Sequence, residues 1–275
     1  MKKSNLLTRI ITGAIFLALV ISSSIFSPYI YLIVFGIFTI IGNLEYYKMC
    51  NVKNTFPQNY SGIIISIVLF ASLFFISAGL LEIKYLLITL TLISIVPIIE
   101  IYRKKETPLN NWAQTLFAIL YIALPFGLLS RLLFIGDSHQ FTGKILISFF
   151  IFIWVSDTGA YCAGSLFGKH KLIPRISPKK TIEGLVGGII FTIIAAIPIY
   201  YITEIFTLLD WIIISLICVI FATLGDLAES MIKRDAGIKD SGKLLPGHGG
   251  VLDRFDSVLL AAIPVTTYLF LRNLI

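Results

Sequence analysis

The polar stretch at residues 230–256, SMIKRDAGIKDSGKLLPGHGGVLDRFD, carries side chains suited to phosphate chemistry. It is the longest polar interval of the chain and lies between two apolar runs, residues 211–224 and 258–275. Its glycines break a helix and let the backbone approach a ligand closely. Carboxylates and cations on one loop are what metal-bound phosphate chemistry requires. The cations are Lys233, Arg234, Lys239, Lys243 and Arg254, the carboxylates are Asp235, Asp240, Asp253 and Asp256, and the turn comprises Pro246, Gly247, His248, Gly249 and Gly250.

Three aspartates lie where the apolar runs meet this stretch. Asp226 ends the preceding run, on a predicted helix that places Glu229 and Ser230 on the same face. Asp253 and Asp256 begin the following run, in the first helical turn, where the helix dipole favours negative charge. The helix dipole alone would account for either Asp253 or Asp256. Asp226, at a helix end, could simply reach the water around the lipid headgroups. An ionisable group at the edge of hydrocarbon is costly, however, so we favour a functional interpretation.

The two aspartates at the ends of the apolar runs could share a ligand. If the helices that carry them pack together, Asp226 and Asp256 could chelate a divalent cation with oxygen ligands. A salt bridge to one of the nearby Lys or Arg residues is the competing interpretation.

A second basic motif, SPKKTIEG at residues 177–184, precedes another apolar run. Its lysines and hydroxyls could hold phosphate oxygens. Two other interpretations stay open, because Ser177 and Pro178 also fit the start of a helix and lysine pairs on cytoplasmic loops often act only as topology signals. The candidate phosphate-binding residues are Ser177, Lys179, Lys180 and Thr181.

Two further polar residues are candidates for the same site. Asp157, in WVSDTGAY, interrupts an apolar run and is expected to face a polar cavity near the cytoplasmic side. His248 lies between glycines, where it could act as an acid/base group or as a donor to backbone or phosphate.

The elements that position these residues are membrane-spanning helices, as the composition indicates. The chain of 275 residues is 57% hydrophobic, with a mean hydropathy of +0.93 and 13% charged residues, against about 25% in soluble proteins. The net charge of +7 would also suit nucleic acid, but an excess of Lys and Arg on cytoplasmic loops explains it better in a membrane protein. The scattered Cys50, Cys162 and Cys218 indicate neither a disulfide framework nor a zinc site.

We predict an all-α, polytopic integral membrane protein with about nine transmembrane helices, because about 20 mostly apolar residues span the hydrocarbon. A polar loop is expected at residues 45–60, and Pro125 is expected to kink the fifth span. The predicted spans are residues 10–26, 29–44, 62–80, 85–101, 112–134, 145–167, 185–201, 211–227 and 258–274.

The distribution of Lys and Arg predicts the orientation. With nine spans, all but four of the 22 Lys and Arg residues lie on the side of the N-terminus. Positive residues collect on the cytoplasmic side, so the N-terminus and the basic loops that carry Lys179 and His248 should lie inside, where nucleotides and Mg²⁺ are found. The C-terminus should lie outside. The four exceptions are Lys84, Arg131, Lys144 and Arg272.

The candidate residues all lie in the second part of the chain. Residues 1–111 are predicted to form N-terminal transmembrane helices without an assignable motif. Residues 112–275 are predicted to form a C-terminal catalytic transmembrane region with cytoplasmic loops.

The stretch at residues 230–256 resembles the full signature of the phosphatidate cytidylyltransferase (CDP-diacylglycerol synthase) family. SPKKTIEG and DTGAY resemble upstream motifs of this family, so the resemblance covers roughly residues 154–256. The signature elements are Ser230, the pair Lys233 and Arg234, the pair Lys239 and Asp240, Gly242, the pair Leu245 and Pro246, the run His248, Gly249 and Gly250, the pair Asp253 and Arg254, and Asp256.

The resemblance implies an enzyme that transfers the cytidylyl group of CTP to phosphatidate, giving CDP-diacylglycerol and pyrophosphate in phospholipid biosynthesis. It implies Mg²⁺ held by Asp226 and Asp256, with a monovalent cation such as K⁺ as a candidate second ion. The expected catalytic residues are Asp226, Asp256, Lys239, Asp253 and Lys233. The expected substrate-binding residues are Ser177, Lys179, Lys180, Thr181, Arg234, Asp240, His248, Gly249, Gly250 and Arg254.

The resemblance also bears on partners and location. The family is thought to form dimers, so a homodimer is a candidate state. The expected location is a bacterial inner membrane, with the active site facing the cytoplasm. Beyond CTP, phosphatidate and the lipid bilayer, no nucleic-acid partner is expected.

Two other functions fit parts of the sequence. A CTP-dependent polyprenol or phytol kinase would use similar basic and acidic loops but would phosphorylate an alcohol and release CDP. A membrane transporter could also use intramembrane carboxylates, but its polar groups should lie near the midplane rather than at one face.

Overall fold

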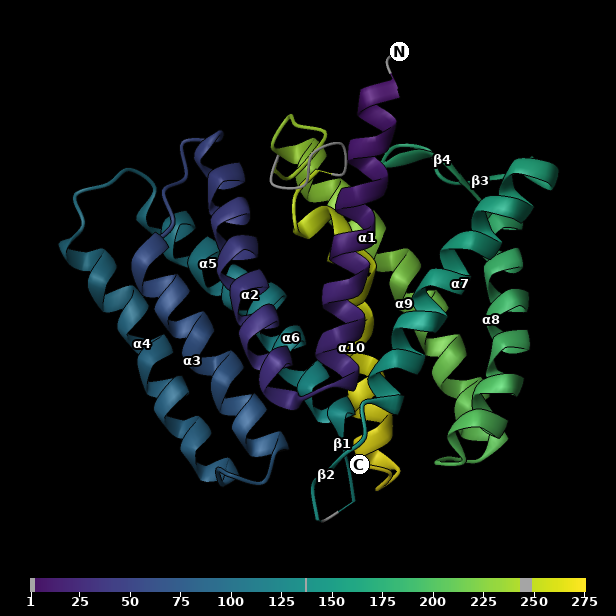
Figure 1. The fold of residues 1–275 in the computed structure, drawn as a ribbon. Helices are drawn as coiled ribbons and strands as arrows, with labels where there is room; N and C mark the ends of the chain where they lie inside the picture. Colours follow the sequence, from purple (N-terminus) through teal and green to yellow (C-terminus); the bar gives the residue numbers. More distant parts are fainter. Residues whose placement is uncertain (1–2, 137, 243–248) are drawn as a thin grey trace.

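Helices dominate the protein (Figure 1), whose computed structural model describes residues 3–136, 138–242 and 249–275. Two short antiparallel hairpins connect helices: β1 (Phe134–Ile135) pairs with β2 (Gln140–Phe141), and β3 (Lys171–Ile173) pairs with β4 (Ser177–Thr181). The long helices are α1 (Lys3–Ile25), α2 (Pro28–Asn51), α3 (Asn59–Ser77), α4 (Leu86–Tyr102), α7 (Lys144–Phe167), α8 (Ile182–Thr203), α9 (Leu208–Asp235) and α10 (Leu252–Leu271). The shorter helical elements are α5 (Pro108–Ala118), α6 (Leu124–Leu129) and the single turns η1 (Ile83–Tyr85), η2 (Ile119–Ala123) and η3 (Ser130–Leu133).

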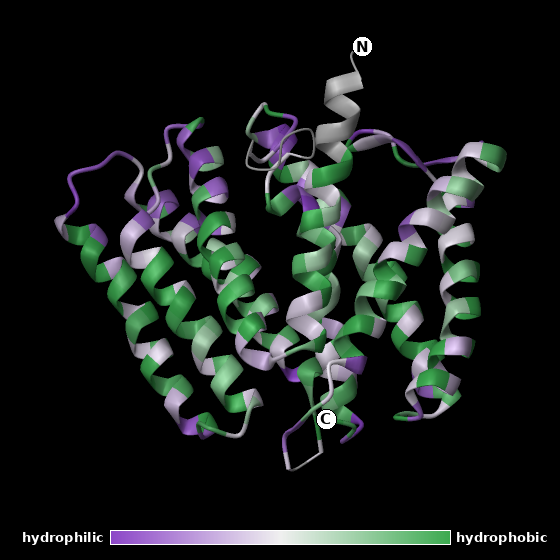
Figure 2. Ribbon diagram, in the orientation of Figure 1, coloured by the Kyte–Doolittle hydropathy of each residue, from purple (hydrophilic) through white to green (hydrophobic). Residues whose placement is uncertain are grey.

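The helices are built to cross a membrane. Within the described residues, eight helical segments are long and apolar enough to do so, and Ile10–Ile25 of α1 is a shorter apolar helix. Figure 2 shows apolar residues along the middle of the helices and hydrophilic residues toward their two ends. The chain is therefore an integral membrane protein with multiple spans, and the predicted all-α architecture with about nine transmembrane helices is confirmed.

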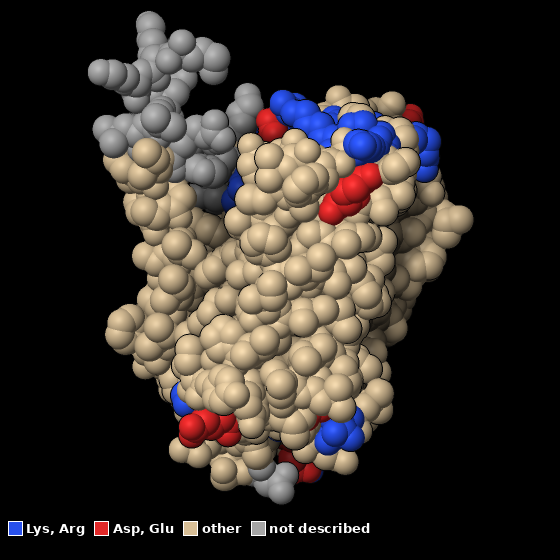
Figure 3. Space-filling view, turned by 90° about the vertical axis from the view of Figure 1, so that its right-hand side faces the viewer, with Lys and Arg blue, Asp and Glu red and all other residues tan. Residues whose placement is uncertain are grey.

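The connections between helices fall at two opposite ends of the molecule. The start of α1, the β3–β4 hairpin, the end of α9 and the start of α10 lie at one end, and the β1–β2 hairpin and the C-terminus lie at the other (Figure 1). On the face seen in Figure 3, Lys and Arg gather at the first end, and a broad belt of uncharged side chains separates it from the second. We call the first end the basic end.

A cluster of aromatic rings joins the N-terminal helices to the last one. Phe255 of α10 is 1% exposed and packs between Phe38 of α2 and Phe126 of α6, with ring centroids 5.1 and 5.0 Å away. Phe35 of α2 contacts the same ring at 5.6 Å. Such offset and edge contacts add to the large apolar area that aromatic residues bury. The start of α10 therefore packs against residues of both predicted regions, residues 1–111 and residues 112–275.

The fifth span, Pro108–Leu133, is helical but irregular. The π-helical turn η2 separates α5 from α6, directly before Pro125. In a regular helix, the proline ring would clash with the carbonyl group of Tyr121, four residues earlier, and the proline has no N–H to donate. A wider turn relieves both problems. The expected disturbance is thus present, but it precedes the proline.

Two helices continue past the ends that hydrophobicity predicted. The polar loop expected at residues 45–60 is wrong in its first part, because α2 continues to Asn51 and keeps Glu45 on a helix. The eighth span continues to Asp235, so Lys233 and Arg234 lie on α9 rather than in a loop. A hydrophobic run marks the extent of the hydrocarbon, whereas good helix formers can extend the helix into the interface.

Candidate active site

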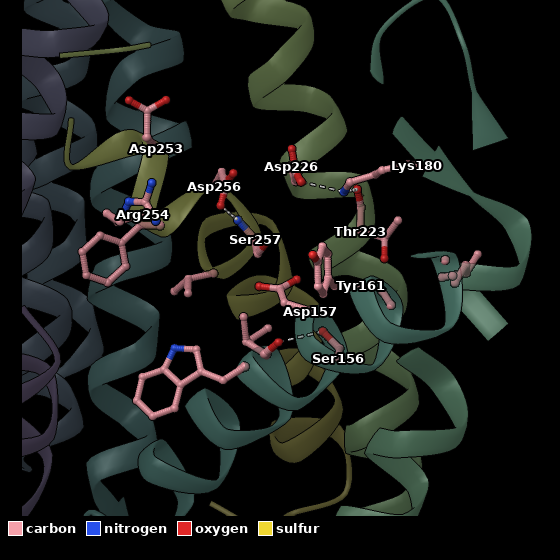
Figure 4. Close-up of a pocket in the computed structure, with 18 of the residues that line it drawn as sticks. Ser156, Asp157, Tyr161, Lys180, Thr223, Asp226, Asp253, Arg254, Asp256 and Ser257 are labelled. Atoms are coloured by element: carbon pink, nitrogen blue, oxygen red, sulfur yellow. Dashed lines mark hydrogen bonds and ion pairs between the residues drawn. The ribbon is translucent and has the colours of Figure 1, made fainter. Parts of the chain in front are cut away.

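A cavity of about 860 Å³ lies between α1, α7, β4, α9 and α10 (Figure 4). One part of its lining is polar and comes mainly from the ends of helices and from β4. Another part is apolar and comes from the spanning segments of α1 and α7. Mostly apolar cavities with a few convergent polar groups are typical ligand sites. The polar lining includes Asp157, Lys179, Lys180, Asp226, Asp253, Arg254 and Asp256, and the apolar lining includes Phe16, Leu17, Val20, Phe150, Trp154 and Phe255.

Asp226 and Asp256 come together because α9 and α10 pack closely at Gly225. A Cβ atom at Gly225 would collide with the carbonyl oxygen of Asp256 and would lie 3.2 Å from the Cα atom of Ser257. Small residues let two helix backbones approach in this way in membranes. Figure 4 shows Asp226 and Asp256 bordering the same space, with Asp157 of α7 below them. The helix packing on which the prediction of a shared site depended is therefore present.

Asp226 has two polar partners on different elements. One carboxylate oxygen lies 2.7 Å from Nζ of Lys180, and the other accepts a hydrogen bond from Oγ of Ser230 at 3.2 Å. Ser230 follows one turn later on α9, as the predicted shared face requires. Lys180 also lies 3.4 Å from the carbonyl oxygen of Thr223. The salt bridge that competed with a metal site is thus formed, and it holds the ammonium group at the cavity.

The motif SPKKT forms a strand, so the interpretation of Ser177 and Pro178 as a helix start is wrong. Thr181 is the N-cap of α8, and its hydroxyl accepts the N–H of Gly184 at 3.1 Å. A proline tolerates the edge of a two-stranded hairpin because the missing N–H is not needed there. Lys179 is exposed, Lys180 is half-buried and Thr181 is buried, so the strand becomes more buried toward the start of α8.

The acidic residues of the cavity fit a divalent cation that is completed by other ligands. Within the described ranges, no group of three or more His, Cys, Asp or Glu side chains is arranged to hold a metal ion by itself. Mg²⁺, however, is commonly bound through one or two carboxylates together with water and substrate phosphates. Asp226 and Asp256 offer such oxygen donors from two packed helices, and Asp157 adds a third carboxylate to the same lining.

Asp253 binds protein groups rather than pointing into the centre of the cavity. Its Oδ2 atom accepts the N–H groups of Ser241 and Gly250, both at 2.8 Å, and lies 2.9 Å from Oγ of Ser241. Its Oδ1 atom lies 2.7 Å from Nζ of Lys233, which also pairs with the buried Glu229 one turn earlier on α9. Lys233 and Asp253 therefore tie the end of α9 to the start of α10.

Several candidates among the described residues are not part of the lining of the cavity. Arg234 is exposed and donates to the carbonyl oxygen of Ile238 at 3.3 Å, and Lys239 and Asp240 are also exposed. Ser177 lies at the far end of β4 from Thr181. Gly249 and Gly250 precede α10, whereas His248 falls outside the described residues.

Glu45 is a residue of this region that the sequence analysis did not single out. It lies on α2, is 8% exposed, and accepts the N–H groups of Val251 and Leu252 at 3.0 Å each. A signal was available, because a carboxylate at the end of an apolar run is costly to bury without partners. The same rule pointed to Asp226, but the predicted loop at residues 45–60 assigned Glu45 to solvent.

The fold and the cavity define a class of multispan membrane proteins with an acidic and basic site at one end of the bundle. The chain belongs to the cytidylyltransferase family, whose model matches residues 7–272. This result confirms the resemblance that the motifs indicated.

The chain is also similar in sequence to individual proteins of known name. The chain is 33% identical to the phosphatidate cytidylyltransferase of Haemophilus influenzae over 95% of this chain and 97% of that protein. It is 38% identical to that of Staphylococcus aureus (strain COL) over 62% of this chain, and the aligned part spans 63% of the S. aureus protein. The protein of the same name from Staphylococcus haemolyticus is 37% identical over 70% of this chain and 69% of its own length.

Proposed function

We propose that this protein transfers the cytidylyl group of CTP to phosphatidate and releases CDP-diacylglycerol and pyrophosphate. One observation carries the proposal: a single cavity joins Lys180, Asp226 and Asp256 to an apolar lining from membrane-spanning helices. A substrate with a phosphate headgroup and acyl chains needs both kinds of lining. The family and the names of the similar proteins agree with this activity.

The reaction requires positioning and charge neutralisation more than acid/base catalysis. A phosphate oxygen of phosphatidate attacks the α-phosphorus of CTP, a new P–O bond forms, and the bond from the α-phosphorus to the bridging oxygen of the β-phosphate breaks. The electron pair leaves with pyrophosphate. The nucleophile is already anionic, so no strong general base is needed. Catalysis of such transfers depends on holding the reactants in line and stabilising phosphate charge.

The carboxylates of the cavity would hold Mg²⁺. Asp226 and Asp256 would be its protein ligands, and Asp157, which lines the same cavity, would support it through water. The bound cation would neutralise triphosphate charge and favour departure of pyrophosphate. A second, monovalent cation such as K⁺ remains part of the proposal on the strength of the family resemblance alone.

The basic residues would bind the remaining phosphate charge. Lys180 already lies at the cavity through its contacts with Asp226 and the carbonyl group of Thr223. Lys179 and Arg254 line the same space from β4 and α10. The exposed Lys239 and Arg234 belong to the same basic end and would attract CTP by long-range steering.

The apolar lining would accept the lipid from the side. Phe16 and Leu17 of α1 and Phe150 and Trp154 of α7 lie on spanning segments, so acyl chains can remain in hydrocarbon while the headgroup reaches Lys180. The basic end then faces the cytoplasm, as the excess of Lys and Arg there favours. We place the protein in the inner membrane of a bacterium, and a homodimer is its proposed state.

An assay with purified protein, labelled CTP and phosphatidate tests the function. We expect CDP-diacylglycerol and pyrophosphate in equal amounts. Release of CDP with phosphorylation of a polyprenol or phytol would instead identify a lipid kinase. Solute flux in liposomes without nucleotide turnover would identify a transporter.

A further inference from the structure

Glu45 lies far from the signature residues in sequence but contacts them in the fold. Val251 and Leu252, whose N–H groups it accepts, begin the helix that carries Arg254 and Asp256. Oε2 of Glu45 also lies 3.2 Å from Oγ of Ser241. Among the described residues, the hydrogen bonds of this buried carboxylate therefore join α2 to Ser241 and to the start of α10.

The start of α10 has no cap of its own. Val251 occupies the N-cap position with helical backbone angles, and its side chain cannot accept a hydrogen bond. The first N–H groups of a helix need acceptors when they are buried. A carboxylate there also interacts favourably with the helix dipole. Glu45 thus supplies from another helix the cap that the local sequence lacks.

Two glycines of the signature stretch make room for this carboxylate. A Cβ atom at Gly242 or at Gly250 would collide with the carboxylate of Glu45. We expected such glycines to let the backbone approach a ligand, and the group that they approach here is Glu45. The carboxylate therefore lies close to both Gly242 and Gly250 while it binds the start of α10.

Asp253 completes the arrangement from within α10. Its Oδ2 atom accepts the N–H of Gly250, and the hydroxyl of Ser241 lies within hydrogen-bond distance of both Asp253 and Glu45. The two carboxylates hold Ser241 and Gly250 on one side and the first turn of α10 on the other. Asp256 lies one turn further along that helix, at the cavity.

We propose that Glu45 is a positioning residue for the cytidylyl transfer, which sets the start of α10 and thereby the place of Asp256 and Arg254. The kinetic test of this proposal rests on the proposed function. The hydrogen-exchange test described below does not. Glu45 is absent from the lining of the cavity, so it acts through α10 and not on a substrate. A small displacement of catalytic groups can lower a rate by about 100-fold.

The kinetic test uses Glu45→Ala and Glu45→Gln. We expect kcat to fall on the order of 10- to 100-fold for Ala, with KM for CTP and for phosphatidate within about 3-fold of the wild type, because no substrate contact is lost. Gln keeps one acceptor oxygen but turns an amide NH₂ toward the second N–H, so its loss should be intermediate. A large rise in KM with unchanged kcat would overturn the proposal.

Glu100→Gln is the matched control. Glu100 is also a buried carboxylate, 4% exposed, and it accepts from Gln58, Arg103 and Asn111 within the N-terminal helices. Its loss should lower the unfolding temperature but leave kcat of the folded protein unchanged. If Glu45→Gln behaves in the same way, Glu45 is an ordinary structural residue and the proposal is wrong.

Two further measurements test whether Glu45 positions the start of α10, even if Glu45→Ala does not fold. Ser241→Ala should lower kcat in the wild type but have little further effect in Glu45→Gln, since both act through the same contacts. Hydrogen exchange at the amides of Val251 and Leu252 should be faster in Glu45→Gln than in Glu100→Gln. Unchanged exchange rates at these two amides would show that Glu45 does not cap α10. An inactive wild type would refute the proposed function instead, and the exchange result would still stand.

Discussion

Asp226 and Asp256 border the same space but have different partners. Asp226 binds Lys180 and Ser230, whereas Oδ1 of Asp256 accepts the N–H of its neighbour Ser257 at 2.7 Å. If Mg²⁺ binds as proposed, Asp226 would exchange its ammonium partner for that cation, and Asp256 would gain a cationic partner. A carboxylate near hydrocarbon needs a counter-charge, and the proposed cation would supply one to Asp256.

The variants Asp226→Asn and Asp256→Asn should each lower kcat by at least about 100-fold, because Asn keeps the size of Asp but loses the charge that holds Mg²⁺. The double variant should be little worse than either single variant, since residues that act as a unit are not additive. Steady-state kinetics over a range of Mg²⁺ concentrations measures this. Asp235→Asn is the control, because Asp235 is an exposed residue at the end of α9. Substantial Mg²⁺-independent activity of folded Asp256→Asn would rule out a shared metal site.

Lys180→Ala should lower kcat/KM for CTP by about 10- to 100-fold without unfolding the protein, because it removes a cation from the cavity. Lys171→Ala removes an exposed lysine from β3 of the same hairpin and should change kcat/KM less than about 2-fold. Equal activity of both variants at limiting CTP and phosphatidate would mean that the lysine pair at positions 179 and 180 is only a topology signal.

At the scale of elements, the close contact between α9 and α10 brings Asp226 and Asp256 to the same cavity. Gly225→Ala should destabilise the protein by about 1–3 kcal/mol, as overpacking does, and should lower activity by separating Asp226 from Asp256. Thermal unfolding and kcat measured on the same preparation test this. Gly36→Ala is the control, because its Cβ would lie at an ordinary 3.5 Å from Phe70. Comparable losses for both variants would show that the close approach at Gly225 has no special role.

The sequence predicted those parts of the site that depend on local signals. Asp226 and Asp256 stand out because each is polar where an apolar run begins or ends, and the helices that carry them follow from hydrophobicity. Lys180 was a candidate because of its basic motif, which could also be only a topology signal. The strand at SPKKT was not predicted, because Ser177 and Pro178 also fit a helix start, whereas the helix begins only after Thr181. The π-helical turn before Pro125 depends on how a helix relieves one clash, which hydropathy does not encode.

The contacts of Glu45 and Asp253 could not be predicted in the same way. Glu45 meets Val251 and Leu252 across most of the chain, and one sequence contains no signal for which distant N–H groups a carboxylate will accept. The role of Asp253 depended on the position of Ser241, which no periodicity fixes. Long-range polar pairing is therefore the part of this site that needed the fold.

At the scale of the whole molecule, the separation of charge predicts how the protein lies in the membrane. In a variant whose native cysteines Cys50, Cys162 and Cys218 are replaced, Arg272→Cys should react with an impermeant thiol reagent added to intact cells. Lys179→Cys should react only after the membrane is opened, because positive residues collect on the cytoplasmic side. If the reagent added outside the cells labels position 179 but not position 272, the proposed orientation is wrong and the opposite one holds.

The cavity lies between the first helix and the last. Phe16 of α1 contacts Phe255 of α10 with ring centroids 5.3 Å apart, and both residues line the cavity. Ribosomes synthesise the chain from its N-terminus, so α1 enters the membrane long before its partner exists. On the proposed function, a nascent chain halted before α10 would carry Lys180 and Asp226 but would lack Arg254 and Asp256, so it should not consume CTP. On the proposed function, cytidylyl transfer would therefore begin only after α10 has been synthesised and inserted.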